Sequence, residues 1–140
     1  MTGTLRPPTV TPTSSLTLFV PCRVWSVNEQ RRWIWQQRSR EQRKVRELAA
    51  MTVLAFKAAV RRGKEPPVSM GTPVGIEVTP VTARRIMDAD NSAGMAKHVI
   101  DGLVDAGLLS ADMPDVVAWV RFNTPEKGRP EGLRLELVPA

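Results

Sequence analysis

The chain has 140 residues and a mass of 15.5 kDa, a size that suits one domain with one modest core. Its apolar runs, among them 16–20 and 116–120, are no longer than five residues, far shorter than the roughly 18–20 residues that span a bilayer, and its single cysteine excludes an internal disulfide. The first residues lack an apolar stretch long enough for a signal peptide, so we expect an intracellular, cytoplasmic protein, of bacterial or viral origin, without membrane contact.

The charge balance favours a polyanionic partner. Twenty Lys and Arg residues against 14 Asp and Glu give a net charge of +6 and an isoelectric point near 10.4. Residues 23–64 hold twelve of the basic and three of the acidic residues, a net +9, while the rest of the chain carries −3. A metal-dependent enzyme acting on a phosphate polymer needs such a division, because one surface holds the polyanion and another the cation. Simple charge segregation explains the same pattern equally well.

The first third of the chain predicts a tail, a strand and a loop. Residues 1–15 are rich in Pro, Thr and Ser and cannot bury enough surface to offset the entropy of ordering, so we expect a disordered tail before a domain at 16–140. Leu16–Val20 is a β-rich run stopped by Pro21, which predicts a strand. The mixed segment 23–35 predicts a loop that leads into a helix.

A long helix is predicted over residues 36–62, which contain no Gly or Pro. Apolar side chains recur there at three- and four-residue spacing, at Val45, Leu48, Ala49, Ala55, Phe56 and Ala59. Met51, Val53 and Leu54 widen this stripe, so burial should increase toward the C-terminal end. Gly63 is the expected stop, and residues 64–72 form a loop.

Three more strands and a second helix follow. Apolar residues alternate at 74–78, 116–122 and 133–137, which is the period of a half-buried strand. Residues 92–106 carry an apolar face at helical spacing and end at Gly107, with Asn91 or Ser92 as the N-cap. Residues 125–130 predict a hairpin-like loop between the last two strands. This order of elements predicts a small α/β domain with a mixed β-sheet.

The chemistry candidates lie between residues 87 and 117. Asp88 and Asp90 stand two apart between a predicted strand and a predicted helix, where two carboxylates repel each other unless a cation sits between them. Oxygen ligands suit Mg²⁺ or Mn²⁺, and the shortage of Cys and His argues against zinc. Asp112 and Asp115 follow the second helix, and the turn there can return a third carboxylate to the pair. The alternative is helix capping plus solvated acids.

On the second helix, Lys97, Asp101 and Asp105 are spaced by four and share a polar face. Exposed ion pairs of this kind stabilise a helix by only about 0.3–0.5 kcal/mol. Lys97 has a second interpretation, because it lies two turns from the aspartate pair and can orient a phosphate or offset charge in a transition state.

The basic segment supplies candidate contacts to nucleic acid. Phosphate contacts are expected from Arg31, Arg32, Arg38, Arg40, Arg43 and Lys44. Trp33 and Trp35 beside them are suited to stack on unpaired bases, with packing in a core or dimer interface as the alternative. For Asn28 we expect a role in bracing a turn.

The order and spacing of these residues resemble the signature of the RusA family of Holliday junction resolvases: DxDN, a lysine, then D(A/G)L, a glycine and an aspartate. The matching positions are Asp88, Asp90, Asn91, Lys97, Asp101, Gly107 and Asp112. Upstream, Pro21 and Ser26-Val27-Asn28 are similar to the family's proline, serine and asparagine turn, so the likeness covers roughly residues 16–138. The gap from Asp90 to Lys97 is longer than in the short family version, and Ala111 replaces the first acid of a tandem pair.

The resemblance implies a homodimeric, Mg²⁺-dependent endonuclease that cuts four-way DNA junctions symmetrically in recombination and repair, with no organic cofactor. Carried over by position, it implies that Asp88, Asp90 and Asp112 bind the metal, that Lys97 is a catalytic lysine and that Asp101 is a supporting acid. Two alternatives stand beside it. One is a non-catalytic, structure-selective DNA-binding module, and the other is a nuclease that prefers flaps or forks.

Overall fold

The computed structural model describes residues 15–68, 73–83 and 93–140. The disordered tail expected at 1–15 falls outside these ranges except for Ser15, and so do Asp88, Asp90 and Asn91. Within the described ranges the chain forms one α+β domain in which helices pack on a mixed sheet. The expected fold class is therefore confirmed.

The sheet contains β1 (Leu16–Pro21), β2 (Val74–Thr82), β3 (Val117–Phe122), β4 (Glu126–Lys127) and β5 (Gly132–Pro139). Its order is β1-β5-β2-β3, and β4 pairs with the end of β2. β5 runs antiparallel to both β1 and β2, whereas β2 and β3 are parallel. The predicted hairpin is wrong, because β3 and β5 lie on opposite sides of β2 and the segment between them adds the short parallel strand β4.

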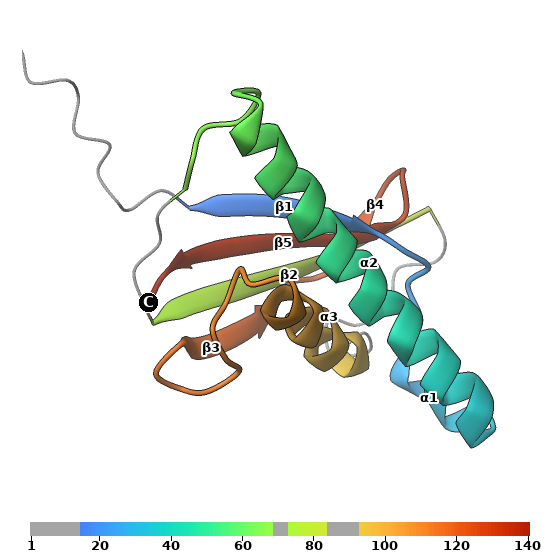
Figure 1. The fold of residues 1–140 in the computed structure, drawn as a ribbon. Helices are drawn as coiled ribbons and strands as arrows, with labels where there is room; N and C mark the ends of the chain where they lie inside the picture. Colours follow the sequence, from blue (N-terminus) through green and yellow to red (C-terminus); the bar gives the residue numbers. More distant parts are fainter. Residues whose placement is uncertain (1–14, 69–72, 84–92) are drawn as a thin grey trace, which may run out of the picture.

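Three helices accompany the sheet: α1 (Val27–Arg32), α2 (Trp35–Arg61) and α3 (Ala93–Asp105). Figure 1 shows α2 and α3 side by side over one face of the sheet, with α1 near the start of α2. The alternating strand residues supply the other half of the core, including Leu18, Ile76, Val78, Leu133 and Leu135. On the opposite face Trp119 lies over Gly75, where any side chain would meet its ring, and the Arg121 guanidinium lies 5.2 Å from the Trp119 ring centroid.

The segment expected to be a loop contains the short helix α1. Ser26 is its N-cap, and the Ser26 hydroxyl accepts a hydrogen bond from the Glu29 amide at 3.1 Å. The chain then turns at Trp33 and Ile34, which are both extended, and α2 begins. Six residues are too few for apolar periodicity to be recognised, so the sequence pattern missed this helix. Asn28 is an exposed residue of α1, and the capping role belongs to Ser26.

α2 matches its predicted bounds within one residue, but its buried side differs from the prediction. The residues that are fully buried are Val45, Ala49 and Val53, near the middle of the helix. Burial increases toward the C-terminal end, as predicted, but Met51 and Leu54 are 62% and 54% exposed and do not widen the buried stripe. Their positions in the helical repeat point away from the sheet, which hydrophobicity alone did not reveal. Gly63 follows the helix with a φ of 71°, a left-handed conformation that favours glycine.

α3 crosses α2 at Gly102. A Cβ added at Gly102 would lie only 2.7 Å from the Ala49 Cβ and would also collide with the Arg46 carbonyl oxygen. Glycine therefore allows the two helix backbones to approach more closely than any other residue would. Gly107, with a φ of 78°, then ends the turn after α3, as predicted.

Candidate nucleic-acid and metal site

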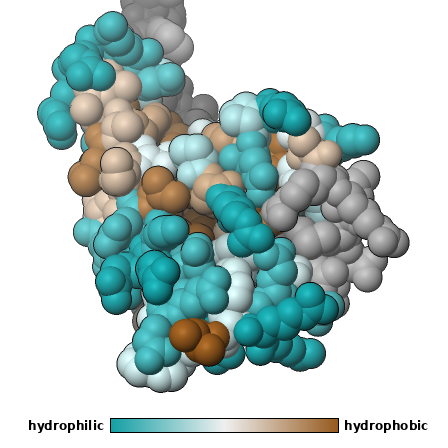
Figure 2. All heavy atoms as spheres, turned by 90° about the vertical axis from the view of Figure 1, so that its right-hand side faces the viewer, coloured by the Kyte–Doolittle hydropathy of each residue, from teal (hydrophilic) through white to brown (hydrophobic). Residues whose placement is uncertain are grey.

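The basic residues of α1 and the first half of α2 form an exposed surface. Five of the six predicted phosphate contacts are exposed there: Arg31, Arg32, Arg40, Arg43 and Lys44. Figure 2 shows hydrophilic side chains over the lower part of this side of the molecule, where α1 and the start of α2 lie. Lys44 makes a 3.5 Å ion pair with Glu41, and no ion pair joins the other four to a described acid. We call these five residues the basic surface.

Arg38 differs from the other basic residues. It is half-buried, its guanidinium donates a 3.5 Å hydrogen bond to the Trp33 carbonyl oxygen, and its Nε is buried without a partner among the described residues. An arginine in this position braces the turn between α1 and α2. Its sequence neighbours gave no sign of this, because only the helical phase relative to the core distinguishes it from Arg40.

The two tryptophans near the basic surface have different surroundings. Trp33 packs edge-on against the buried Trp25, with ring centroids 5.3 Å apart. Trp35 is 70% exposed, and its neighbour Ile34 is 66% exposed. Core packing therefore accounts for Trp33, whereas Trp35 retains a free ring surface next to the basic surface.

The first turn of α3 packs against α1. A Cβ at Gly94 would lie 2.7 Å from the Gln30 side-chain oxygen, and the Trp25 amide donates to the Met95 sulfur at 3.4 Å. Lys97 lies four residues after Ala93, or about 6 Å along the helix. The end of α3 that directly follows the Asp88-Ala89-Asp90-Asn91 motif is thus beside the basic surface, although the motif itself lies outside the described residues.

Arg46 connects α2 to two acids of α3. Its guanidinium donates to the two carboxylate oxygens of Asp105 at 2.5 and 2.8 Å, and it lies 4.0 Å from Asp101. The Lys97 ammonium is 3.7 Å from the Asp101 carboxylate, and the Lys97 side chain is 71% exposed. The hydrogen bonds with Arg46 lower the pKa of Asp105 and raise the pKa of Arg46. The predicted i,i+4 pair of Lys97 and Asp101 is confirmed.

Sequence reasoning missed the role of Arg46. A weak signal existed, because the residue falls one helical turn after Gln42 on the flank of the apolar stripe. Which helix would face that flank depended on the tertiary packing of α2 and α3.

Asp112 lies near the other end of α3. Its neighbours Leu109 and Ser110 line a hollow with Val116 and with Val74, the first residue of β2. In the sequence, the motif at 88–91 follows β2 and precedes α3, whereas Asp112 follows α3. The 13 residues of this helix extend about 18 Å along its axis. Asp112 is exposed and makes no hydrogen bond or ion pair with a described residue. Within the described residues no three Asp, Glu, His or Cys side chains gather as metal ligands.

Two other reactive side chains are partly buried. Burial, reinforced by the charge of Glu131, raises the pKa of the Cys22 thiol to about 12, so this group stays protonated at neutral pH. His98 is half-buried on α3, and desolvation lowers its pKa against the opposing effect of Asp101.

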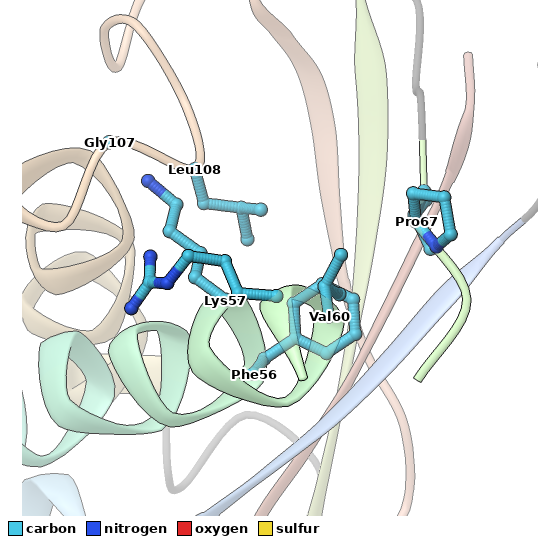
Figure 3. A pocket seen from close by; sticks show the side chains of 8 residues that line it. Phe56, Lys57, Val60, Pro67, Gly107 and Leu108 are labelled. Atoms are coloured by element: carbon cyan, nitrogen blue, oxygen red, sulfur yellow. The ribbon is translucent and has the colours of Figure 1, made fainter. Parts of the chain in front are cut away.

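An apolar hollow of about 400 Å³ lies at the C-terminal half of α2, between this helix, Pro67 and Leu108 (Figure 3). Lys57 crosses it and donates a 2.7 Å hydrogen bond to the Ala106 carbonyl oxygen, beyond the last turn of α3. None of the predicted site residues lines this hollow. Its lysine stabilises the helix end and is not free to bind a ligand.

Comparisons with protein-family models, with curated proteins and with solved structures found no match to this chain. In the described parts of the chain, no helix combines the length and the apolar character needed to cross a membrane.

Proposed function

We propose that this protein is a Mg²⁺-dependent endonuclease that resolves four-way DNA junctions by paired phosphodiester hydrolysis, with Mn²⁺ as a substitute ion. One observation carries the proposal. The first turn of α3, which follows directly after the Asp88–Asn91 motif, packs on α1 beside Arg31 and Arg32. A DNA backbone held by the basic surface would therefore run past the place where the aspartate pair joins the fold.

Each residue of the proposed site has a separate task. Asp88, Asp90 and Asp112 offer the carboxylate oxygens that Mg²⁺ prefers, and the exposed Asp112 carboxylate is not engaged by a described cation. Bound Mg²⁺ supplies Lewis-acid stabilisation of the scissile phosphate and lowers the pKa of water. Lys97 is exposed on the end of α3 nearest the motif and would contact a phosphate oxygen. Asp101, 3.7 Å from the Lys97 ammonium, helps to position it, and Asn91 is assigned a supporting role by its match to the DxDN motif.

The test is cleavage of a synthetic four-way junction, beside a linear duplex and a flap, with Mg²⁺ and with EDTA. Asp90→Asn keeps the side-chain size and removes one charge, so we expect the cleavage rate to fall by at least about a hundredfold. Asp115→Asn is the matched control, because Asp115 is exposed and lies outside the proposed site. Wild-type cleavage by the Asp90 variant, or junction binding without any Mg²⁺-dependent cut by the native protein, would overturn the proposal.

Asp112 is tested separately because it follows the C-terminal end of α3, whereas the motif precedes this helix in the sequence. If it binds the metal, Asp112→Asn lowers cleavage as strongly as Asp90→Asn and raises the Mg²⁺ concentration needed for half-maximal activity. Cleavage by the Asp112 variant at the native rate would remove this residue from the site and leave Asp88 and Asp90 as the metal ligands.

The proposed enzyme acts as a homodimer, because a four-way junction has two-fold symmetry and paired cuts require two sites. Sedimentation of the protein with and without junction DNA measures this directly. We expect a dimer at micromolar concentration, and a monomer under both conditions would contradict paired cleavage by one assembled enzyme.

A further inference from the structure

A polar hollow of about 340 Å³ lies between the first half of α2 and α3, next to the basic surface. It is lined by Ser39, Gln42, Arg43, Arg46, His98 and Asp101. Its volume equals that of about ten water molecules, which is ample for a group of several heavy atoms. In contrast to the hollow at the other end of α2, every side chain that lines it carries a hydrogen-bonding group.

The charges around this hollow leave one positive charge in excess. Arg46 is held by Asp105 and lies 4.0 Å from Asp101, which also lies 3.7 Å from Lys97. Arg43 is exposed at the rim and makes no ion pair with a described acid. Three cations therefore face two carboxylates. A single added negative charge, accompanied by several acceptor oxygens, would balance the cluster.

We propose that this hollow is a phosphodiester-binding subsite that holds one backbone phosphate of a bound nucleic acid. The proposal rests on the proposed function, since it names where the substrate backbone is held. A backbone phosphate carries one negative charge, which matches the excess charge of the cluster. Its oxygens would accept hydrogen bonds from the Arg43 guanidinium, the Ser39 hydroxyl and the Gln42 amide. In this arrangement the nucleic-acid backbone crosses α2 and α3, and Lys97 lies one helical turn before Asp101 on α3.

His98 makes the subsite observable. It is the only histidine of the chain, so its ring gives one unambiguous set of NMR signals. Desolvation lowers its pKa, Asp101 raises it, and Lys97 and Arg46 lower it further; Arg43 is the other charged group that lines the hollow with it. A bound phosphate adds a negative charge beside the ring and therefore raises the pKa of His98.

The experiment follows the His98 ring signals of the full chain by NMR in EDTA, while a 16-base-pair DNA duplex, inorganic phosphate or NaCl of matched ionic strength is added. Fluorescence anisotropy of a labelled duplex measures binding in the same buffer. We expect the duplex to shift the His98 signals saturably and to raise its pKa. Arg43→Ala should abolish the shift and weaken duplex binding about tenfold. Arg62→Ala removes the same charge at the C-cap of α2, about 28 Å away along the helix axis, and there the His98 shift should persist.

Three results would overturn the proposal. The first is a His98 signal that does not move although anisotropy shows that the duplex is bound, and the second is a DNA-induced shift that is unchanged in the Arg43→Ala variant. The third is a shift caused by inorganic phosphate but not by DNA. The last result would assign the hollow to a small phosphate compound. Because EDTA prevents cleavage, these outcomes are independent of the junction-cleavage assay. A His98 shift without Mg²⁺-dependent cleavage would support the subsite and overturn the nuclease.

Discussion

Replacement of Gly102 by alanine should destabilise the protein even though alanine is the better helix former. The added Cβ would meet the Arg46 carbonyl oxygen and lie 2.7 Å from the Ala49 Cβ, whereas ordinary contacts are 3.4–4 Å. The contact with Ala49 must lengthen by about 0.7 Å or more, and the other two nearest atoms, the Arg46 carbonyl oxygen and the Ala50 amide nitrogen, are backbone, so the two helices have to separate. Overpacking lowers the free energy of unfolding by about 1–3 kcal/mol, and we expect a value near the upper end of this range at Gly102. The higher helix propensity of alanine offsets roughly 1 kcal/mol of this loss. We expect a net loss of about 2 kcal/mol.

Urea unfolding measures this loss. With an m-value of about 2 kcal/mol/M, the midpoint should fall by roughly 1 M while m stays constant. Gly94→Ala is the matched control on the same helix, because the one atom too close to its added Cβ is the flexible end of Gln30 at 2.7 Å, while Trp25 and Val27 lie at ordinary contact distances. The control should retain the native midpoint or exceed it. If Gly102→Ala were as stable as the native protein, the close approach of α2 and α3 would not be what requires glycine.

Three further predictions concern single charges and the thiol. Asp105→Asn should destabilise the protein most at neutral pH, because Arg46 lowers the pKa of Asp105 in the folded state. The stabilisation is present above the unfolded pKa of about 3.9 and is lost as the pH falls through the folded pKa. In urea unfolding, the difference in stability between the variant and the native protein should therefore be smaller at pH 3 than at pH 7. Cys22 should react slowly with a disulfide reagent at pH 8 in the native protein and at the rate of a free thiol in urea; fast native labelling would contradict its raised pKa. Arg31→Ala and Arg32→Ala should each reduce the slope of log affinity for DNA against log salt by about 0.9, and an unchanged slope would remove that residue from the interface.

The sequence predicted those elements whose periodicity extends over many residues. The long helix α2, the helix α3 and the strands β1, β2, β3 and β5 follow from repeats of 3.6 and 2 residues. The six residues of α1 are too few to show a period. Local sequence patterns also could not predict the pairing of the strands, because long-range packing decides which strands pair with β2. β5 therefore lies between β1 and β2 and does not pair with β3.

The candidate site was predictable in its residue types but not in its surroundings. Arg38 and Arg40 look equivalent in the sequence, yet Arg38 braces the turn beside Trp33 while Arg40 is exposed. The same holds for Trp33 and Trp35, one packed on Trp25 and the other exposed. In each pair the two residues stand two apart, and a step of two in a helix or turn changes the face that a side chain occupies.

The two ends of α3 have different relations to the proposed chemistry. The first turns carry Lys97 and lie against α1, so this lysine is on the same side of the molecule as the basic surface proposed to hold nucleic acid. Arg46 of α2 holds α3 in position through two hydrogen bonds to Asp105. At the same crossing Gly102 has no side chain, which allows the two helices to approach closely. Loosening the crossing should therefore affect more than stability. Gly102→Ala should also reduce the His98 shift caused by duplex DNA, whereas Gly94→Ala should not, and equal shifts in both variants would separate the subsite from the helix crossing.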